Sequence, residues 1–222
     1  KKASVSATES GRLQLAEWVS HPNHPLTARV MANRVWQHLF GKGIVTTSDN
    51  FGIRGMKPSH PELLDYLAGR FVDNQWSVKA LIREIVTSKT YQQAAQAAAE
   101  EDPSNAALQH QNLRPATAET MRDSILAIAG ELDLEPRNSV VQPLGMFAIT
   151  TTGVRHQSLG ETEQLRQRSI YLPIVRGAIP PALAIFDFPN PDLVTGERAT
   201  TTVPVQALFM MNHPFVRTQA RL

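Results

Sequence analysis

The chain has 222 residues, of which 42% are hydrophobic and 19% charged, and its formal net charge is +2. A chain of this length can bury roughly 70% of its unfolded surface, so it needs no disulfide or metal to hold a core. Its hydrophobic content argues against a disordered chain. The arginines are scattered, which argues against the basic face of a nucleic-acid-binding protein. No apolar run reaches the ~18 residues of a membrane span. The sequence contains no cysteine, which excludes disulfides, thiol nucleophiles and thiolate metal sites in this segment.

The ends of the sequence indicate a segment of a longer polypeptide, because it begins at Lys1 without Met and ends inside an apparent helix. Residues 1–10 are polar and are expected to be disordered or a linker. Residues 11–222 are expected to form a single, mainly α-helical domain with at most one or two short strands. The Pro- and Gly-rich region near residue 135 is the only candidate for a weak subdivision.

Apolar side chains recur at helical spacing through the first half of the chain. Leu13, Ala16 and Trp18 are expected core residues of the first helix. Ser59 and Glu62 are spaced as a capping box at the start of the third helix. The expected helices of this half cover Arg12–Ser20, Leu26–Phe40, a segment from Ser59, a segment capped by Ser77, and the alanine-rich stretch Ala94–Ala99.

The second half is less regular. A strong helix is expected from a Thr117 cap to about Leu132, with Arg122 and Asp123 on its outer face. Residues 133–163 are punctuated by proline and glycine, and we expect an irregular region there. The remaining expected elements are an edge strand over Ser169–Val175, a short helix within Pro180–Phe188, and a last helix that begins at Pro204 with Thr202 as its cap.

Polar groups are unusually dense on the second helix and in the loop after it. Asn33, Arg34 and His38 are expected on the polar face of that helix, opposite the apolar arc. The loop and the next helix start add Asp49, Asn50 and His60, which complete the first part of a candidate polar site.

The second part of the candidate site lies far along the chain. Arg168 and Arg176 flank the expected strand, and Asp187 follows it. Arginine can grip a carboxylate with two parallel hydrogen bonds, so a structural clamp between an arginine and Asp187 is the leading interpretation, and a ligand-binding arginine is the alternative. We expect these residues to meet the polar faces of residues 33–65.

Metal and catalytic motifs are weak. His21 and His24 have an H-x-x-H spacing, but they lie in a proline-rich loop without an adjacent carboxylate, so local backbone hydrogen bonds are the simpler interpretation. No nucleophile elbow or phosphate-binding glycine motif is present. Two carboxyl groups at a suitable separation could hydrolyse a glycoside, but sequence does not supply that separation.

Several segments together carry a family resemblance. They are Asn33-Arg34-Val35-Trp36-Gln37-His38, Asp49-Asn50-Phe51-Gly52, Pro58 to Asp65, Ser88 to Gln92, Arg168 to Tyr171, Phe186-Asp187 and Thr202 to Leu208. The chain resembles a planctomycete-specific domain of unknown function found toward the C-terminus of large proteins, often with a c-type cytochrome domain upstream.

The resemblance implies an extracytoplasmic setting, other domains in the same polypeptide and no established activity. No C-x-x-C-H site is present, so we expect no cofactor in this segment and any haem would belong to a different domain. The leading functional hypothesis is a ligand-binding or scaffolding module, with polysaccharide as a possible ligand. The alternative is a glycan-processing hydrolase with a site built from the residues Arg34, His38, Asp49, His60, Arg176 and Asp187.

Overall fold

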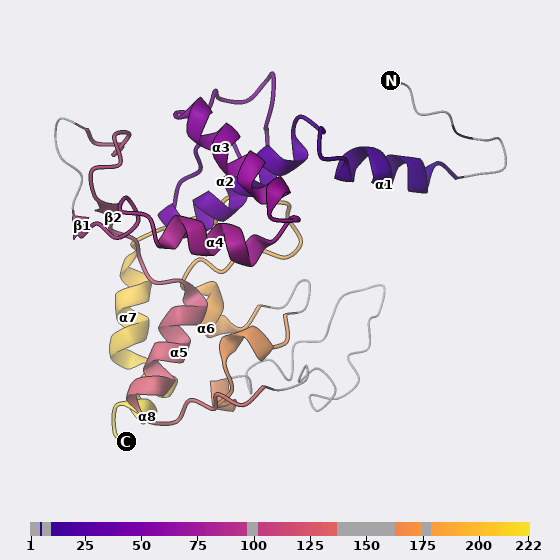
Figure 1. The fold of residues 1–222 in the computed structure, drawn as a ribbon. Coiled ribbons are helices and arrows are strands. Elements are labelled where there is room, and N and C mark those ends of the chain that lie inside the picture. Colours follow the sequence, from indigo (N-terminus) through magenta and orange to yellow (C-terminus); the bar gives the residue numbers. More distant parts are fainter. Residues whose placement is uncertain (1–4, 6–9, 97–101, 137–162, 175–178) are drawn as a thin grey trace. The chain divides into compact units, whose positions relative to one another are not determined.

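A computed structural model describes residue 5 and residues 10–96, 102–136, 163–174 and 179–222 (Figure 1). These residues are mainly α-helical, with two strands of two residues each, which confirms the predicted fold class. Most of the irregular region expected at 133–163, and most of the polar segment at 1–10, lie outside the described residues. In the described part of the chain, no helix is both long and apolar enough to cross a bilayer.

The chain divides into two compact units, Lys1–Arg114 and Pro115–Leu222. This division lies earlier in the chain than the Pro- and Gly-rich region near residue 135. Unit 1 contains the first part of the predicted polar site and unit 2 contains the second part. Each unit is therefore described by itself.

Unit 1 is built on three helices that pack against one another (Figure 1). Gly41 ends the second helix in the left-handed conformation (φ 85°). Ser77 caps the fourth helix, as predicted, by accepting a hydrogen bond from the Ala80 N–H. The core is formed by side chains such as Trp36, Leu64 and Leu81. The elements of unit 1 are α1 (Arg12–Ser20), α2 (Thr27–Phe40), α3 (Pro61–Asp73), α4 (Val78–Val86), β1 (Ala95–Gln96) and β2 (Gln111–Asn112).

Three expectations for unit 1 are wrong. α1 buries none of its residues, and Trp18 is 55% exposed. Ser59 does not cap α3: His60 is the N-cap residue, and the Ser59 hydroxyl donates to the Ile44 carbonyl instead. The alanine-rich stretch is not helical at its start, where β1 pairs in parallel with β2, so tertiary pairing overrides alanine's helix propensity there.

Unit 2 packs short helices around two small apolar clusters, one around Leu126 and Phe209 and one around Leu172 and Leu183. Thr117 caps its first helix by accepting a hydrogen bond from the Thr120 N–H, as predicted. The elements of unit 2 are α5 (Ala118–Ile128), the 3-10 helix η2 (Ser169–Tyr171), α6 (Pro181–Ala184), α7 (Pro204–Asn212) and α8 (Pro214–Gln219).

Several expectations for unit 2 are also wrong. α5 ends at Ile128, before Leu132, and Ile128 itself points to solvent. The segment from Ser169 forms a 3-10 turn where a strand was predicted, because Ser169 is held by side chains of α5. The N-cap of α7 is Val203, where Thr202 was predicted.

Candidate functional site

A cavity of about 530 Å³ opens in unit 1 where α2 meets the end of α3. Its volume falls within the range of small-molecule sites, which are mostly apolar with a few polar groups. Among its lining residues only the Arg34 guanidinium carries a charge. The lining residues are Leu26, Thr27, Val30, Met31, Arg34, Phe71 and Trp76.

Trp76 lies in the turn between α3 and α4, and it forms one wall of the cavity. Gln75 and Trp76 have φ values of 54° and 59°, a conformation that non-glycine residues rarely adopt. The Trp76 N–H donates to the Phe71 carbonyl at 2.9 Å, and the two rings meet edge to face at 5.3 Å between centroids. Such strained positions cluster at ligand clamps, and here the strained turn holds the indole in the cavity wall.

Arg34 is exposed on α2, one turn beyond Val30. Within the described residues it makes no ion pair with a carboxylate. The neighbouring Arg29, by contrast, donates to Asp65 of α3 at 2.5 Å. Arg34 is thus a cation at the edge of an apolar cavity, available to an anionic group of a ligand.

Asn33 does not lie on the outward polar face predicted for it. Its side chain is 1% exposed and bridges both backbone groups of Val45: the Asn33 Nδ2 donates to the Val45 carbonyl at 3.0 Å, and the Val45 N–H donates to Asn33 Oδ1 at 2.8 Å. Gln37, on the next turn, is also buried and accepts from the Ser48 hydroxyl at 2.7 Å. A Cβ on Gly43 would lie 2.9 Å from Asn33 Nδ2, which explains the glycine after Lys42. These two amides fasten the loop that follows α2.

The other predicted polar residues of unit 1 have local structural roles or face solvent. His38 is exposed, and its carbonyl accepts from Arg114 at 3.1 Å. Asp49 and Asn50 are exposed; Asn50 donates to the Arg54 carbonyl at 3.2 Å. The His60 ring contacts its neighbour Ser59. None of these four residues lines the cavity.

His21 and His24 accept the local backbone hydrogen bonds expected of them. His21 Nδ1 accepts from the Asn23 N–H, and His24 Nδ1 accepts from the Thr27 N–H at 3.1 Å, so both rings stabilise the turn between α1 and α2. The rings of His24 and Trp18 are also perpendicular to each other, with centroids 4.4 Å apart. Across the described ranges, no group of three or more metal-binding side chains comes together.

Unit 2 contains a buried polar cluster centred on Arg122 of α5. Arg122 is 3% exposed, contrary to the outer-face position predicted for it. Its guanidinium donates to the carbonyls of Leu165 and Gln167 at 2.5 and 3.0 Å and to the Ser169 hydroxyl at 3.2 Å. Burial lowers the pKa of Arg122 below its ordinary value, and the neighbouring Asp123 carboxylate acts in the opposite direction.

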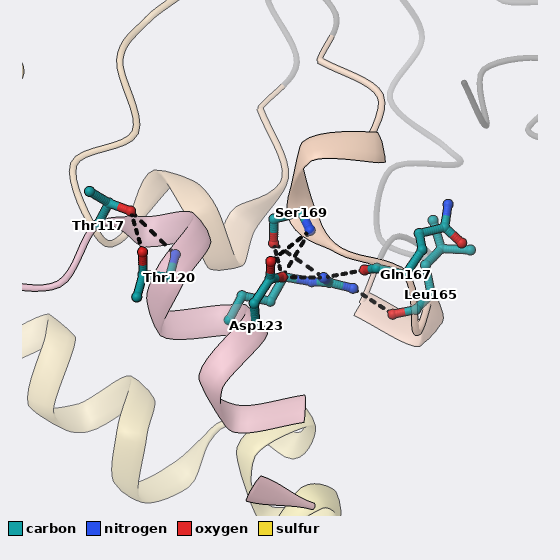
Figure 2. Close-up of polar contacts among 7 residues, drawn as sticks. Thr117, Thr120, Asp123, Leu165, Gln167 and Ser169 are labelled. Carbon is teal, nitrogen blue, oxygen red and sulfur yellow. Dashed lines mark hydrogen bonds and ion pairs between the residues drawn. The ribbon is translucent and has the colours of Figure 1, made fainter. Parts of the chain in front are cut away.

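Asp123 completes the cluster. It accepts from the Ser169 N–H at 2.8 Å and from the Ser169 hydroxyl at 2.6 Å (Figure 2). Arg122 and Asp123 thus bind residues 165–169 to α5, which gives unit 2 an arginine–aspartate clamp. A Ser169 hydroxyl that donates to a carboxylate and is 4% exposed is placed for packing and not for attack on a substrate.

A family model for PSD1, a protein of unknown function (DUF1553), matches residues 11–222. The chain belongs to this family. No curated protein and no solved structure matches it. The family assignment agrees with the predicted resemblance to a domain of unknown function, whereas restriction to planctomycetes and linkage to a cytochrome domain stay predictions.

The PSD1 segments named in the sequence analysis have identifiable structural roles in this chain. The segment from Asn33 supplies the amides that fasten the loop after α2, and Arg34 lines the cavity. Asp187, with φ 58°, accepts from the Thr201 N–H at 2.7 Å and from its hydroxyl at 2.9 Å. Asp187 is therefore hydrogen-bonded to Thr201, and the predicted clamp between an arginine and Asp187 stays a prediction. Arg168 is exposed, and Arg176 lies outside the described residues.

Sequence reasoning missed both the cavity and the buried cluster. Arg122 and Asp123 follow each other on α5, so helical periodicity assigned both to solvent. Only the return of residues 165–169 to this helix makes the burial of Arg122 favourable, because it supplies carbonyl and hydroxyl partners. The one signal available in the sequence was the pair of opposite charges at adjacent positions of α5.

Proposed function

We propose that unit 1 of this PSD1 chain is a ligand-binding module whose cavity takes an apolar group that carries an anion beside it. The observation that carries the proposal is the position of Arg34, an unpaired guanidinium among the described residues, at a cavity lined otherwise by uncharged, mostly apolar side chains. Aliphatic side chains of α2 and the Trp76 indole would bury the apolar group, and Arg34 would bind a carboxylate, sulfate or sulfonate.

The cavity favours binding over glycan hydrolysis. Hydrolysis of a glycosidic bond uses two carboxyl groups that flank it, and none of the residues that line this cavity is a carboxylate. Asp49 and Asp187, the carboxylates of the hydrolase hypothesis, lie in different units. A sulfated polysaccharide remains a ligand to test, because Arg34 could bind its sulfate and Trp76 could stack on a sugar ring.

The proposed cellular location and the neighbouring domains rest on the family resemblance. It implies an extracytoplasmic location and further domains in the same polypeptide, and we propose that the module acts there. The ligand would then be an extracellular or periplasmic molecule, or a segment of a neighbouring domain with the same apolar and anionic character.

The test uses a pair of fluorescent probes that differ in charge. 8-Anilinonaphthalene-1-sulfonate carries a sulfonate on an apolar aromatic body, and N-phenyl-1-naphthylamine has the same body without the charge. We expect both to bind the chain, with Arg34→Gln weakening only the sulfonate by about tenfold, the loss expected for one charge-assisted contact. Trp76→Ala should weaken both probes.

Arg83→Gln, on the exposed surface of α4, is the matched control and should leave both affinities unchanged. Dextran sulfate and dextran, added as competitors, separate a sulfated glycan ligand from a neutral one. Equal binding of both probes by the Arg34→Gln variant and the original chain would remove the anion site. Failure of either probe to bind would remove the cavity as a ligand site.

A further inference from the structure

The start of α2 lacks the usual helix cap. Leu26 occupies the N-cap position, and its side chain has no group that can accept a hydrogen bond. The acceptor comes instead from the turn before the helix, because His24 Nδ1 accepts from the Leu26 N–H at 3.3 Å and from the Thr27 N–H at 3.1 Å. A single imidazole nitrogen thus satisfies the two backbone amides with which α2 begins.

These contacts fix the protonation of the His24 ring. A backbone N–H can only donate, so Nδ1 carries no proton while it accepts from these amides. The other ring nitrogen, Nε2, is enclosed and has no hydrogen-bond partner in the described part of the chain, and the Trp18 ring stands perpendicular to the imidazole. The arrangement therefore holds a neutral imidazole with its proton on Nε2, and a second proton on the ring has to go to Nδ1.

The Thr27 hydroxyl offers a protonated Nδ1 a different partner. Thr27 Oγ1 lies 2.8 Å from His24 Nδ1 and 2.8 Å from the Val19 carbonyl oxygen. With Nδ1 protonated, its N–H donates to Oγ1 and the single hydroxyl proton goes to the Val19 carbonyl. The amides of Leu26 and Thr27 then lose their acceptor. The same atoms support two hydrogen-bond arrangements, and one proton decides between them.

The charged and titratable groups on the neighbouring elements are bonded elsewhere or face solvent. Arg29 of α2 pairs with Asp65 of α3. His21 accepts a hydrogen bond within its own turn, and Glu17 of α1 is exposed. Among the residues that the structure describes, none of these groups is bonded to the His24 ring. The hydrogen bonds at Nδ1 therefore decide what a proton on this ring does.

Leu26 and Thr27 also line the cavity. We propose that His24 controls this cavity by pH: the neutral ring holds the start of α2 in the cavity wall, and protonation releases it and weakens ligand binding. This inference rests on the proposed function, since it concerns the same cavity. Histidine is the side chain that ordinarily changes its charge between about pH 5 and pH 8. Binding is therefore strongest at the upper end of this range and weakens as the pH falls through it.

The test compares the affinity of N-phenyl-1-naphthylamine for the 222-residue chain at about pH 8 and about pH 5. This probe is uncharged at both values, so its own titration does not enter. We expect the affinity to fall roughly tenfold, the loss expected when two neutral hydrogen bonds in the cavity wall open. His24→Asn, whose amide oxygen accepts from the same N–H groups but does not titrate, should keep its affinity at the lower pH.

His21→Asn is the matched control, because it removes a titrating imidazole from the same turn and should keep the original pH dependence. Amide hydrogen exchange provides a readout without any probe: protection of the Leu26 and Thr27 amides, corrected for the intrinsic effect of pH, should fall over the same range in the original chain and stay constant in His24→Asn.

Three results would overturn the pH control: a probe that binds equally at both pH values, amide protection that does not change, or a His24→Asn variant that keeps the original pH dependence. These results leave the proposed ligand cavity standing. A probe that binds at neither pH removes the cavity itself as a ligand site, and the pH control with it.

Discussion

Replacement of Arg122 by methionine should destabilise unit 2 strongly. Methionine has a similar length, so the change removes the charge and its hydrogen bonds with little loss of volume. The carbonyls of Leu165 and Gln167 would lose their donor, and Asp123 would lose its neighbouring cation while keeping the donors of Ser169. The two carbonyls left without a donor and the partly buried carboxylate left without its cation together cost about 3–5 kcal/mol.

That loss is large against the total stability of a domain, which is about 5–15 kcal/mol. For a unit of this size it corresponds to a fall in Tm of roughly 15 °C or more. Ser169→Ala provides a graded comparison: it removes one side-chain hydrogen bond to a carboxylate and should cost about 2 kcal/mol.

The assay exploits the distribution of tryptophan. The chain has three tryptophans, Trp18, Trp36 and Trp76, and all lie in unit 1. Urea unfolding followed by tryptophan fluorescence therefore reports unit 1, whereas far-UV circular dichroism reports the helices of both units. In the Arg122→Met variant, we expect an earlier circular dichroism transition and an unchanged fluorescence transition. An unchanged circular dichroism midpoint would refute the clamp, and equal shifts in both signals would refute its confinement to unit 2.

Two further predictions concern single polar groups. Asn33→Ala should destabilise unit 1 by about 2–4 kcal/mol, seen as an earlier fluorescence transition in urea, because it leaves both backbone groups of Val45 unpaired; an effect below about 1 kcal/mol would mean that water replaces the amide. Burial alone would raise the pKa of Glu119, but hydrogen bonds, chiefly from Arg198, outweigh it and lower that pKa below its ordinary 4.5. Glu119 thus stabilises the fold above pH 4.5, and this stability is lost as the pH falls through the lowered pKa. Glu119→Gln should cost at most about 1 kcal/mol at neutral pH for this partly exposed pair, and the difference from the original chain should shrink as the pH falls from about 6 to about 3; a difference independent of pH would contradict the ion-pair assignment.

The sequence by itself determined the helices whose ends carry a local signal. Gly41 can adopt the left-handed conformation that ends α2, and Ser77 and Thr117 place a hydroxyl on the free N–H groups of α4 and α5. These signals act within one helical turn, so they can be recognised in the sequence without knowledge of the rest of the chain. The same holds for the mainly helical fold class and for the resemblance to a domain of unknown function, which agrees with the match of the PSD1 family model to residues 11–222.

Only the tertiary structure decided which polar residues are buried. Helical periodicity placed Asn33 and Arg122 toward solvent, yet both are enclosed, because the backbone of Val45 and of residues 165–169 returns to pair with them. A polar side chain can be buried at low cost only where distant groups complete its hydrogen bonds, and those groups are 12 or more positions away in the chain. The cavity beside Arg34 has the same origin, since its walls come from α2, the end of α3 and the strained turn at Trp76.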